Sequence, residues 1–239
     1  KWKGYAFGHK SAQGNHYGNH VKVMTATSAA MGGREVPLAV ISPDGNFEKK
    51  RPTLYLLNGA GGAEQGMDWI TATAKRDVNP EQEGVQDMVD FYTSKDVKVV
   101  IPQADAFSYC TDWVSSPNNG YLKGPQKWET FLTKELPAYL EGNFGVARNN
   151  NSIAGLSMGG TAALNLAARN PAMFKQAMSW SGYLTMSGPG MSTLVRLAML
   201  DLGGFNVNNM YGSMFNPNRY ENDPFWNMGA LRGKDVYIS

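Results

Sequence analysis

Short apolar runs recur along the chain and end at turn-forming residues, which is the pattern of β-strands. Six runs predict strands, at residues 21–25, 36–41, 53–57, 97–101, 177–180 and 236–238. The runs at 53–57 and 97–101 are continuous rather than alternating, which is typical of strands covered on both faces, as in a parallel sheet between helices. The segment Pro43-Asp44-Gly45-Asn46 predicts a turn after the second strand.

Between these runs, apolar residues recur at the spacing of a helix. A stripe at offsets of 0, 3, 4, 8 and 11 predicts a core-facing helix, and its members are Trp128, Phe131, Leu132, Leu136 and Tyr139. Pro137 weakens the second half of this prediction. A second helix is predicted at 162–168, where Ala and Leu dominate, and it stops at Asn170-Pro171. A shorter helical patch spans 193–200.

The order of strands and helices predicts one three-layer α/β domain at residues 20–239. Residues 1–19 are rich in Gly, Asn, Lys and aromatic residues, and we expect an irregular N-terminal arm there. No internal repeat and no long linker divides the remainder. Residues 187–222, rich in Gly, Met and Asn, predict an excursion from the sheet that shapes a binding cleft.

Composition narrows the class of protein. Of 239 residues, 42% are hydrophobic, and 27 Gly and 12 Pro fall short of low-complexity levels, which excludes a disordered or fibrous protein. A net charge of +2 without a basic block predicts no nucleic-acid partner. No apolar run approaches the ~20 residues of a membrane helix, so no transmembrane segment is predicted. The single cysteine, Cys110, excludes an internal disulfide framework and a cysteine-based zinc site.

The strongest chemical signal is the motif Gly-x-Ser-x-Gly, at Gly155, Ser157 and Gly159. The bare motif occurs by chance, but here an apolar run precedes it and a small-residue helix follows it. This context predicts a tight strand–turn–helix corner with the Ser157 hydroxyl exposed as a nucleophile. The residues two before and two after the serine nearly touch in such a corner, so both must be glycine or very small.

A serine nucleophile also needs donors that stabilise the oxyanion. One donor is predicted to be the backbone N–H of Met158, because it follows the nucleophile at the positive end of a helix. The second is expected in the loop Asn58-Gly59-Ala60-Gly61-Gly62, where glycines allow close approach of the main chain. Ala60 is the preferred donor there and Gly61 the second choice.

The general base is the difficulty, because the acid and the histidine follow the serine along the chain in this class of hydrolase. The three histidines are His9, His16 and His20, and all precede Ser157. Either the N-terminal arm folds back with an unusual base, or the segment with acid and base is missing. We favour the second, since residues 236–239 predict a strand that stops without a cap, and we then expect the histidines to be solvated loop residues.

Several stretches together resemble mycolyltransferases of the antigen 85 type, within the esterase D group of α/β-hydrolases. The most specific are Trp128-Glu129-Thr130-Phe131-Leu132 and Gly155-Leu156-Ser157-Met158-Gly159. The other matching stretches lie at residues 54–59, 66–69, 109–113 and 222–224, and all of them follow one another in the same order as in the family. The variants at 58–62 and 66–69 look more like the corynebacterial branch than the mycobacterial one.

The resemblance implies an α/β-hydrolase fold, here lacking its C-terminal part, and an exported enzyme of the cell envelope or a secreted one. Ser157 would take a mycolyl group from trehalose monomycolate and pass it to a second trehalose monomycolate, to arabinogalactan or to a protein hydroxyl. No metal or organic cofactor is implied. The family carries its acid and histidine beyond the strand that matches residues 236–239. The chain starts at Lys1 with no apolar signal segment, so we expect processing there.

Three substrate-binding positions depart from the family pattern that the resemblance implies. Asn58 stands where Asp is common, Gly61 where Arg is common, and Thr185 where an Asp lines the substrate site. These differences weaken the argument for trehalose as the acceptor. The Met-rich stretch at 186–214 is predicted either as a flexible wall for a lipid chain or as ordinary core and loop packing.

Two other functions fit the same residues. One is a carboxylesterase of the same fold that acts on a small soluble ester, because hydrolysis and transfer use the same serine and oxyanion hole. The other is a catalytically silent envelope protein that binds glycolipid or a matrix protein, for which the missing base is the support. For residues 1–239 alone we expect negligible turnover, because loss of a triad member leaves only residual catalysis.

Overall fold

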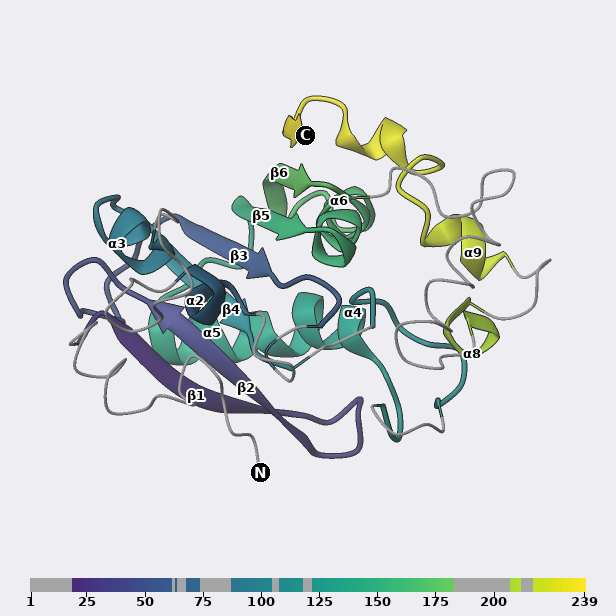
Figure 1. Cartoon of the computed structure of the whole chain (residues 1–239), viewed down its shortest axis with the longest axis horizontal. Helices are drawn as coiled ribbons and strands as arrows, with labels where there is room; N and C mark the ends of the chain where they lie inside the picture. The colour runs from purple at the N-terminus through teal and green to yellow at the C-terminus, as the bar shows by residue number, and fades with distance from the viewer. Residues whose placement is uncertain are drawn as a thin grey trace.

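The described strands form one mixed, mostly parallel sheet of seven strands in the order β1-β2-β4-β3-β5-β6-β7 (Figure 1). The structure is a computed structural model that describes residues 19–61, 63, 68–73, 87–104, 108–117, 122–182, 207–211 and 217–239. The predicted helical patch at 193–200 and nearly all of the N-terminal arm therefore lie outside the described residues.

All six predicted strands are present. The two antiparallel strands at one end of the sheet are longer than predicted, since they span Val21–Ser28 and Arg34–Ile41 rather than 21–25 and 36–41. Strands β1 and β2 pair antiparallel, β2 pairs antiparallel with β4, and the remaining neighbours are parallel. The bounds are β1 Val21–Ser28, β2 Arg34–Ile41, β3 Thr53–Leu57, β4 Lys98–Pro102, β5 Asn151–Leu156, β6 Phe174–Trp180 and β7 Asp235–Ile238.

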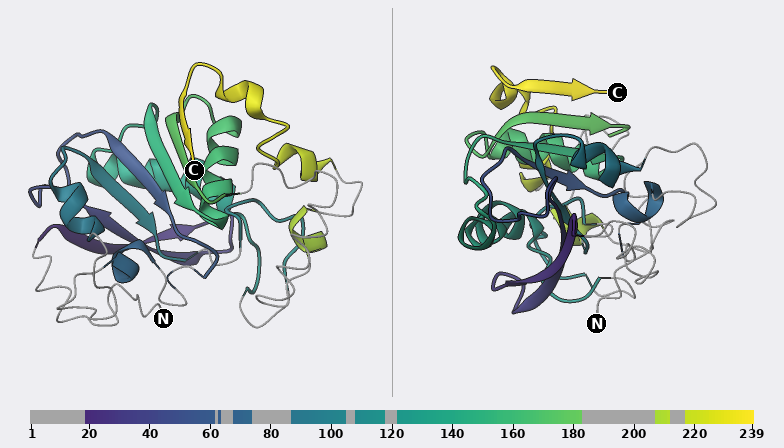
Figure 2. Two further views of the ribbon diagram at one scale, coloured as in Figure 1. Left: turned by 45° about the horizontal axis from the view of Figure 1, so that its top comes forward. Right: turned by 90° about the vertical axis from the view of Figure 1, so that its left-hand side faces the viewer.

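Alternate residues of the central strands pack into two separate cores, one on each face of the sheet. Leu38, Tyr55 and Val100 contribute to the face covered by α5 (Leu136–Phe144) and α6 (Met158–Arg169). Leu54 and Val99 contribute to the opposite face, under α2 (Trp69–Thr73) and α3 (Met88–Thr93). The predicted three-layer architecture is confirmed, and Figure 2 shows the sheet from two further sides.

The helix predicted from Trp128 does not end at Pro137. It starts as α4 (Trp128–Thr130), passes through a π-helical segment η3 (Phe131–Glu135) and continues as α5 to Phe144. Pro137 falls in the first turn of α5. A missing backbone N–H costs little there, because the hydrogen-bond pattern has just changed from that of the π-helical segment to that of an α-helix. The expectation of a weak second half is wrong for this reason.

The chain reverses its direction of travel across the sheet between β3 and β5. After β3 it adds β4 on one side, and it then returns to place β5 on the other side of β3. The loops that follow β3 and β5 consequently leave the same edge of the sheet side by side. Such a switch point at the carboxyl ends of parallel strands is the usual position of a ligand crevice in open α/β sheets.

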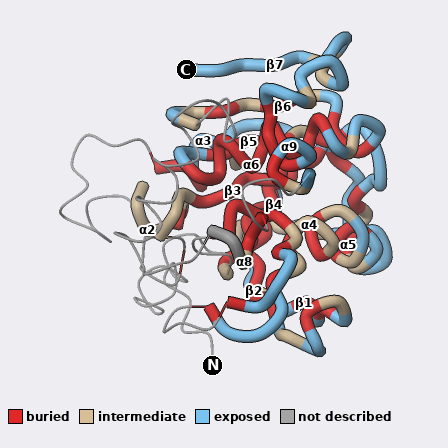
Figure 3. The backbone as a smooth tube through the Cα atoms, turned by 90° about the vertical axis from the view of Figure 1, so that its right-hand side faces the viewer, coloured by how far each residue is buried: buried red, intermediate tan, exposed pale blue. Residues whose placement is uncertain are grey.

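The other end of the sheet is the exposed strand β7 (Figure 3). All four of its residues are exposed, and it pairs in parallel with β6 only. The described helices of the preceding segment are α8 (Val207–Tyr211), α9 (Asn218–Glu221) and the 3-10 helix η4 (Met228–Leu231).

The buried amino group of Lys98 joins three parts of the chain at the amino edge of the parallel strands. Its Nζ donates to the carbonyl oxygens of Phe47 at 2.7 Å and Lys49 at 3.1 Å, and also to that of Phe144. Burial, together with the positive charge of Arg51, lowers the pKa of Lys98 to about 8. Lys98 thus fastens the loop before β3 to the end of α5.

We expect Lys98→Met to lower the free energy of unfolding by about 3 kcal/mol or more, because an unsatisfied buried polar group costs about 1–3 kcal/mol and three acceptors lose their donor. The matched control is Lys175→Met on β6, where the side chain is exposed and the change should stay within about 0.5 kcal/mol. Urea denaturation of both variants measures the difference. Equal losses would contradict the role given to Lys98.

Candidate active site

Ser157 occupies a strained corner between β5 and α6. Its φ of 55° and ψ of −116° lie outside the regions that side-chain-bearing residues favour. Its backbone N–H donates to the carbonyl oxygen of Trp180 at 2.7 Å, so the neighbouring strand β6 helps to hold the corner. The side chain is exposed and makes no capping hydrogen bond to α6. The hydroxyl is therefore presented to solvent at the carboxyl edge of the sheet.

The two glycines of the motif are required by contacts of the main chain. A Cβ on Gly155 would lie 2.1 Å from the carbonyl oxygen of Gly159. A Cβ on Gly159 would lie 2.3 Å from the carbonyl oxygen of Asn58 and 2.9 Å from that of Leu57. The corner is as tight as the sequence predicts, and it also presses directly against the end of β3.

The loop after β3 is fixed in place by the side chain of Asn58. Its Nδ2 donates to the carbonyl oxygen of Pro102 at 2.9 Å, and its Oδ1 accepts from the N–H of Trp69 at 3.2 Å. Asn58 is only 1% exposed. The side chain thus ties the end of β3 to the end of β4 and to the start of α2, which prevents the loop from moving away from Ser157.

Ala60 and Met158, the two predicted oxyanion donors, lie against the same small hydrophobic cluster. Met158 is a buried member of this cluster, and Ala60 packs against it. Within the described part of the chain, neither backbone N–H has a hydrogen-bond partner. The N–H of Met158 is also one of the first amides of α6, which have no acceptor within their own helix. Both amides are available to a ligand at this edge.

The three predicted substrate-binding residues have different positions. Asn58 uses both ends of its side-chain amide within the protein, as described above, so the structure assigns it a structural task. Gly61 is half-buried in the turn after Ala60. Thr185 lies outside the described residues, as does most of the Met-rich stretch at 186–214. Direct contact of the three with substrate stays a prediction.

His20 lies at the opposite edge of the sheet from Ser157. Its Nδ1 is 3.0 Å from the carbonyl oxygen of Ser42, and the next residue, Val21, pairs with Ile41. Ile41 in turn pairs with Val99, near the start of β4. Ser157 follows the end of β5, so the length of the parallel strands separates the two side chains. His20 is not placed to serve as the base for Ser157, and His9 and His16 lie outside the described residues.

Two tryptophans beside Ser157 were missed in the sequence analysis. Trp69 donates from Nε1 to the carbonyl oxygen of Leu57 at 2.8 Å, and its ring meets Trp180 edge-to-face at 5.7 Å. Leu156, which precedes Ser157, pairs with Trp180 and is 41% exposed. Together the three form an apolar surface next to the hydroxyl. From the sequence, this apolar surface could have been predicted only by roughly aligning the ends of neighbouring strands, because its three residues are far apart along the chain.

Two buried polar side chains also lie at this edge. Asp68, at the start of α2, is fully buried, and burial raises the pKa of its carboxyl group. Its Oδ1 has no hydrogen-bond partner in the described part of the chain, and the same holds for both side-chain amide atoms of Gln103, which follows β4. The interior at this edge of the sheet therefore contains polar groups that have no partner among the described residues.

The described residues contain neither a metal-binding cluster nor a membrane-spanning helix. No group of three or more His, Cys, Asp or Glu side chains there is arranged to hold a metal ion. None of the described helices is long and apolar enough to cross a bilayer.

The sheet order and the strained serine corner together define an α/β-hydrolase fold. Comparison with protein families then finds that the Esterase family matches residues 28–238. The chain belongs to this esterase family.

Curated relatives include acyltransferases. The chain is 32% identical over 218 residues to diacylglycerol acyltransferase/mycolyltransferase Ag85A of Mycobacterium tuberculosis, which covers 91% of this chain and 59% of that protein. It is 36% identical over 185 residues to diacylglycerol acyltransferase/mycolyltransferase Ag85C of Mycobacterium avium, with coverage of 77% and 49%. The chain thus spans about half to three fifths of the length of these relatives.

Solved structures share the fold. The crystal structure of Mycobacterium tuberculosis MPT51 (FbpC1) has a TM-score of 0.75 and 26% identity, over 91% of this chain and 72% of that one. FphF, a fluorophosphonate-binding serine hydrolase of Staphylococcus aureus, has a TM-score of 0.64 and 18% identity, over 91% and 77%. The second likeness supports the fold alone.

We expect Gly159→Ala to lower the free energy of unfolding by about 1–3 kcal/mol, because its Cβ would overlap the carbonyl oxygen of Asn58 and force the corner and the β3 loop apart. Gly142→Ala on α5 is the matched control, since its Cβ meets nothing within 4 Å, and it should be neutral or slightly stabilising. Thermal or urea denaturation compares the two, and a harmless Gly159→Ala would refute the close contact.

Proposed function

We propose that this protein is a serine acyltransferase of the cell envelope that moves a mycolyl group from trehalose monomycolate to an acceptor hydroxyl through an acyl-enzyme at Ser157. The observation that supports it best is the exposed Ser157 hydroxyl at a strained corner, beside two backbone amides that have no hydrogen-bond partner among the described residues. The 32% identity to a mycolyltransferase supports the choice of acyl group. The likeness of residues 58–62 and 66–69 to the corynebacterial branch stays a prediction.

In the first half of the reaction, Ser157 Oγ attacks the ester carbonyl carbon of the donor and its proton passes to a general base. The carbonyl oxygen becomes an oxyanion that the N–H groups of Ala60 and Met158 stabilise. Collapse of this intermediate breaks the bond to the sugar oxygen, which takes up the proton and leaves as trehalose. In the second half, an acceptor hydroxyl attacks the acyl-Ser157 ester and restores the free serine.

The acyl chain needs an apolar surface next to Ser157, and the structure offers one in Leu156, Trp69 and Trp180. An exposed leucine beside two half-buried tryptophans is unusual for a surface that only water contacts. A lipid chain laid against it would also keep water from the acyl-enzyme, which favours transfer over hydrolysis. Acceptors that we expect are trehalose monomycolate, arabinogalactan or a protein hydroxyl.

The acid and histidine of the triad are proposed to lie beyond Ser239. His20 is excluded by its position at the other edge of the sheet. The relatives are longer than this chain, so they have room for further catalytic residues. We also infer that residues 20–239 belong to one domain and that the protein is exported to the envelope or secreted. Neither a metal nor an organic cofactor takes part in the proposed reaction.

We expect a fluorophosphonate probe to label the full-length protein at Ser157 and Ser157→Ala to abolish labelling. Ser181→Ala is the matched control, because Ser181 is also an exposed serine with a positive φ of 53° at the same edge of the sheet, and it should label normally. Mass spectrometry of the modified peptide identifies the site. An unlabelled full-length protein would instead favour a catalytically silent binding protein.

Transfer and hydrolysis are separated by their products. With trehalose monomycolate as the substrate, we expect the full-length protein to form trehalose dimycolate faster than free mycolic acid, because an aligned acceptor hydroxyl outcompetes water. Residues 1–239 alone should show less than about a thousandth of this rate, since the triad is incomplete. Thin-layer chromatography of the labelled lipids gives both rates. Free acid as the main product would identify a carboxylesterase.

A further inference from the structure

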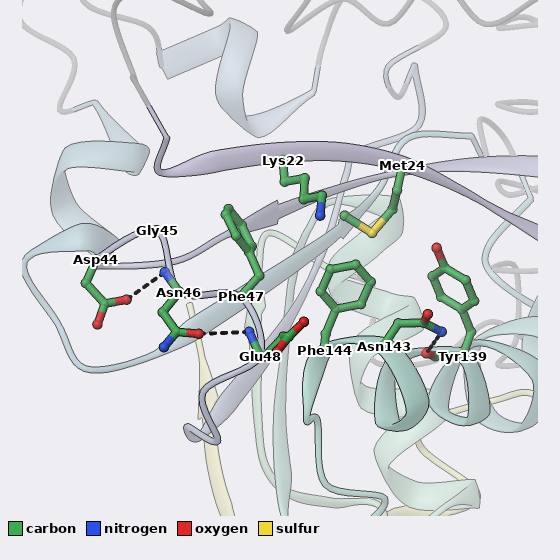
Figure 4. Close-up of a pocket in the computed structure, with 10 residues that line it drawn as sticks. All are labelled: Lys22, Met24, Asp44, Gly45, Asn46, Phe47, Glu48, Tyr139, Asn143 and Phe144. Carbon is green, nitrogen blue, oxygen red and sulfur yellow. Dashed lines mark hydrogen bonds between the residues drawn. The ribbon is translucent and has the colours of Figure 1, made fainter.

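A cavity lies far from Ser157, between β1, the turn after β2 and the end of α5 (Figure 4). Its volume is about 720 Å³, within the ~300–1,000 Å³ range of pockets that hold small organic ligands. The loop and helix that line it lie just before β3 and β5 in the chain. The cavity, here called the rear groove, therefore opens at the amino edge of the sheet, opposite the serine.

Three aromatic rings lie in a row along the rear groove (Figure 4). Phe47 comes from the loop, while Phe144 and Tyr139 come from α5, with their ring centroids 6.0 Å apart. The Nζ of Lys22 lies 5.8 Å from the centroid of the Phe47 ring and 5.6 Å from that of Phe144, which places the two rings on either side of one cation. Phe144 is only 5% exposed, so its ring forms the floor of the groove, and the half-buried rings of Phe47 and Tyr139 are the ones that a ligand can reach.

The walls of the rear groove are held in place before any ligand binds. Lys98 donates to the carbonyl oxygens of both Phe47 and Phe144, so one buried ammonium sets the spacing of two of the rings. Gly145, with a φ of 62°, ends α5 where a Cβ would lie 2.5 Å from the carbonyl oxygen of Glu48. On the loop side, Arg51 binds Asp44 at 2.5 Å and Asp96 at 2.8 Å.

Hydrogen-bonding groups surround the rings. Asn46 accepts from the N–H groups of Glu48 and Lys49 through Oδ1, which leaves its Nδ2 available. Asn143 donates from Nδ2 to the carbonyl oxygen of Tyr139, which leaves its Oδ1 available. In the described part of the chain, no bond engages the Tyr139 hydroxyl or the Glu48 carboxylate. Donors and acceptors thus lie around the aromatic rings.

We propose that the rear groove binds a neutral oligosaccharide, with the C–H faces of successive sugar rings stacked on the half-buried rings of Phe47 and Tyr139, above the buried ring of Phe144. The hydroxyl groups would bond to Asn46, Glu48, Asn143 and the ammonium of Lys22. Such a site would hold the enzyme on a glycan surface while the acyl transfer proceeds at the other edge of the sheet. It is independent of the chemistry at Ser157.

The charges and polar side chains that line the rear groove argue against anions, cations and lipid chains as its ligands. Lys22 is positive while Asp44 and Glu48 are negative, so neither an anion nor a cation meets a field of one sign. A lipid chain needs a continuous apolar lining, whereas polar side chains interrupt this one. A hydroxyl-rich neutral ligand with apolar ring faces matches both features, because aromatic rings take up the faces and amide and carboxylate groups take up the hydroxyls.

The test is a titration of the ¹⁵N-labelled full-length protein with maltotriose and, separately, cellotriose, in which binding is followed by changes in NMR chemical shifts. We expect saturable shifts at the amides of residues 46–48 and 139–144 with at least one sugar, and no equal shifts at 155–159. Phe47→Leu and Tyr139→Leu keep apolar volume but remove a ring face, so each should weaken binding about 2- to 10-fold, and both together more than about 10-fold.

Phe91→Leu is the matched control, because Phe91 is 38% exposed on α3 with the Nζ of Lys95 5.2 Å from its ring, yet lies outside the groove. It should leave the dissociation constant unchanged. If the leucine variants unfold, Glu48→Ala and Asn143→Ala, both at exposed side chains, must weaken binding instead. No saturable shift with either sugar, unchanged affinity in the groove variants, or shifts at 155–159 alone would overturn the rear groove without affecting Ser157 labelling.

Discussion

The close approach of three backbone segments at the carboxyl edge of the sheet is the constraint on which the candidate active site depends. Gly155 and Gly159 bring the start of α6 back against β5, and Gly159 lies directly against the carbonyl oxygen of Asn58. No side chain fits between them, so the strained backbone of Ser157 cannot relax outward. The same contact brings the β3 loop beside the hydroxyl, and the Ala60 amide in this loop has no hydrogen-bond partner in the part of the chain that the structure describes.

The two edges of the sheet are built by different means. At the carboxyl edge, glycines and a buried asparagine let main-chain groups approach one another and leave amides open to a ligand. At the amino edge, the long side chains of Lys98 and Arg51 hold a loop and a helix end at a set spacing, which creates a groove between aromatic rings. The proposed reaction site and the proposed glycan site thus lie at opposite edges of the sheet.

Much of the fold follows from local pattern. Continuous apolar runs indicated the buried strands, and the motif around Ser157 indicated the corner, since both depend on neighbours within a few residues. The sequence analysis underestimated the helix after Pro137. The π-helical segment before Pro137 changes which backbone N–H would bond to the preceding turn, so the proline does not weaken α5 as expected. The pairing of Trp69 with Trp180 and the burial of Lys98 depend on contacts across strands, for which local pattern contains no signal.

By itself, the sequence determined the class of fold, the position of the strained serine corner and the need for glycine on both sides of it, because backbone sterics act over a few bonds. Tertiary structure alone decided that His20 stands at the wrong edge, that Asn58 serves as an anchor, and that Phe47, Tyr139 and Phe144 meet in one groove. Each of these depends on strand order and register, which bring together residues that are distant in sequence, and no local preference specifies that order.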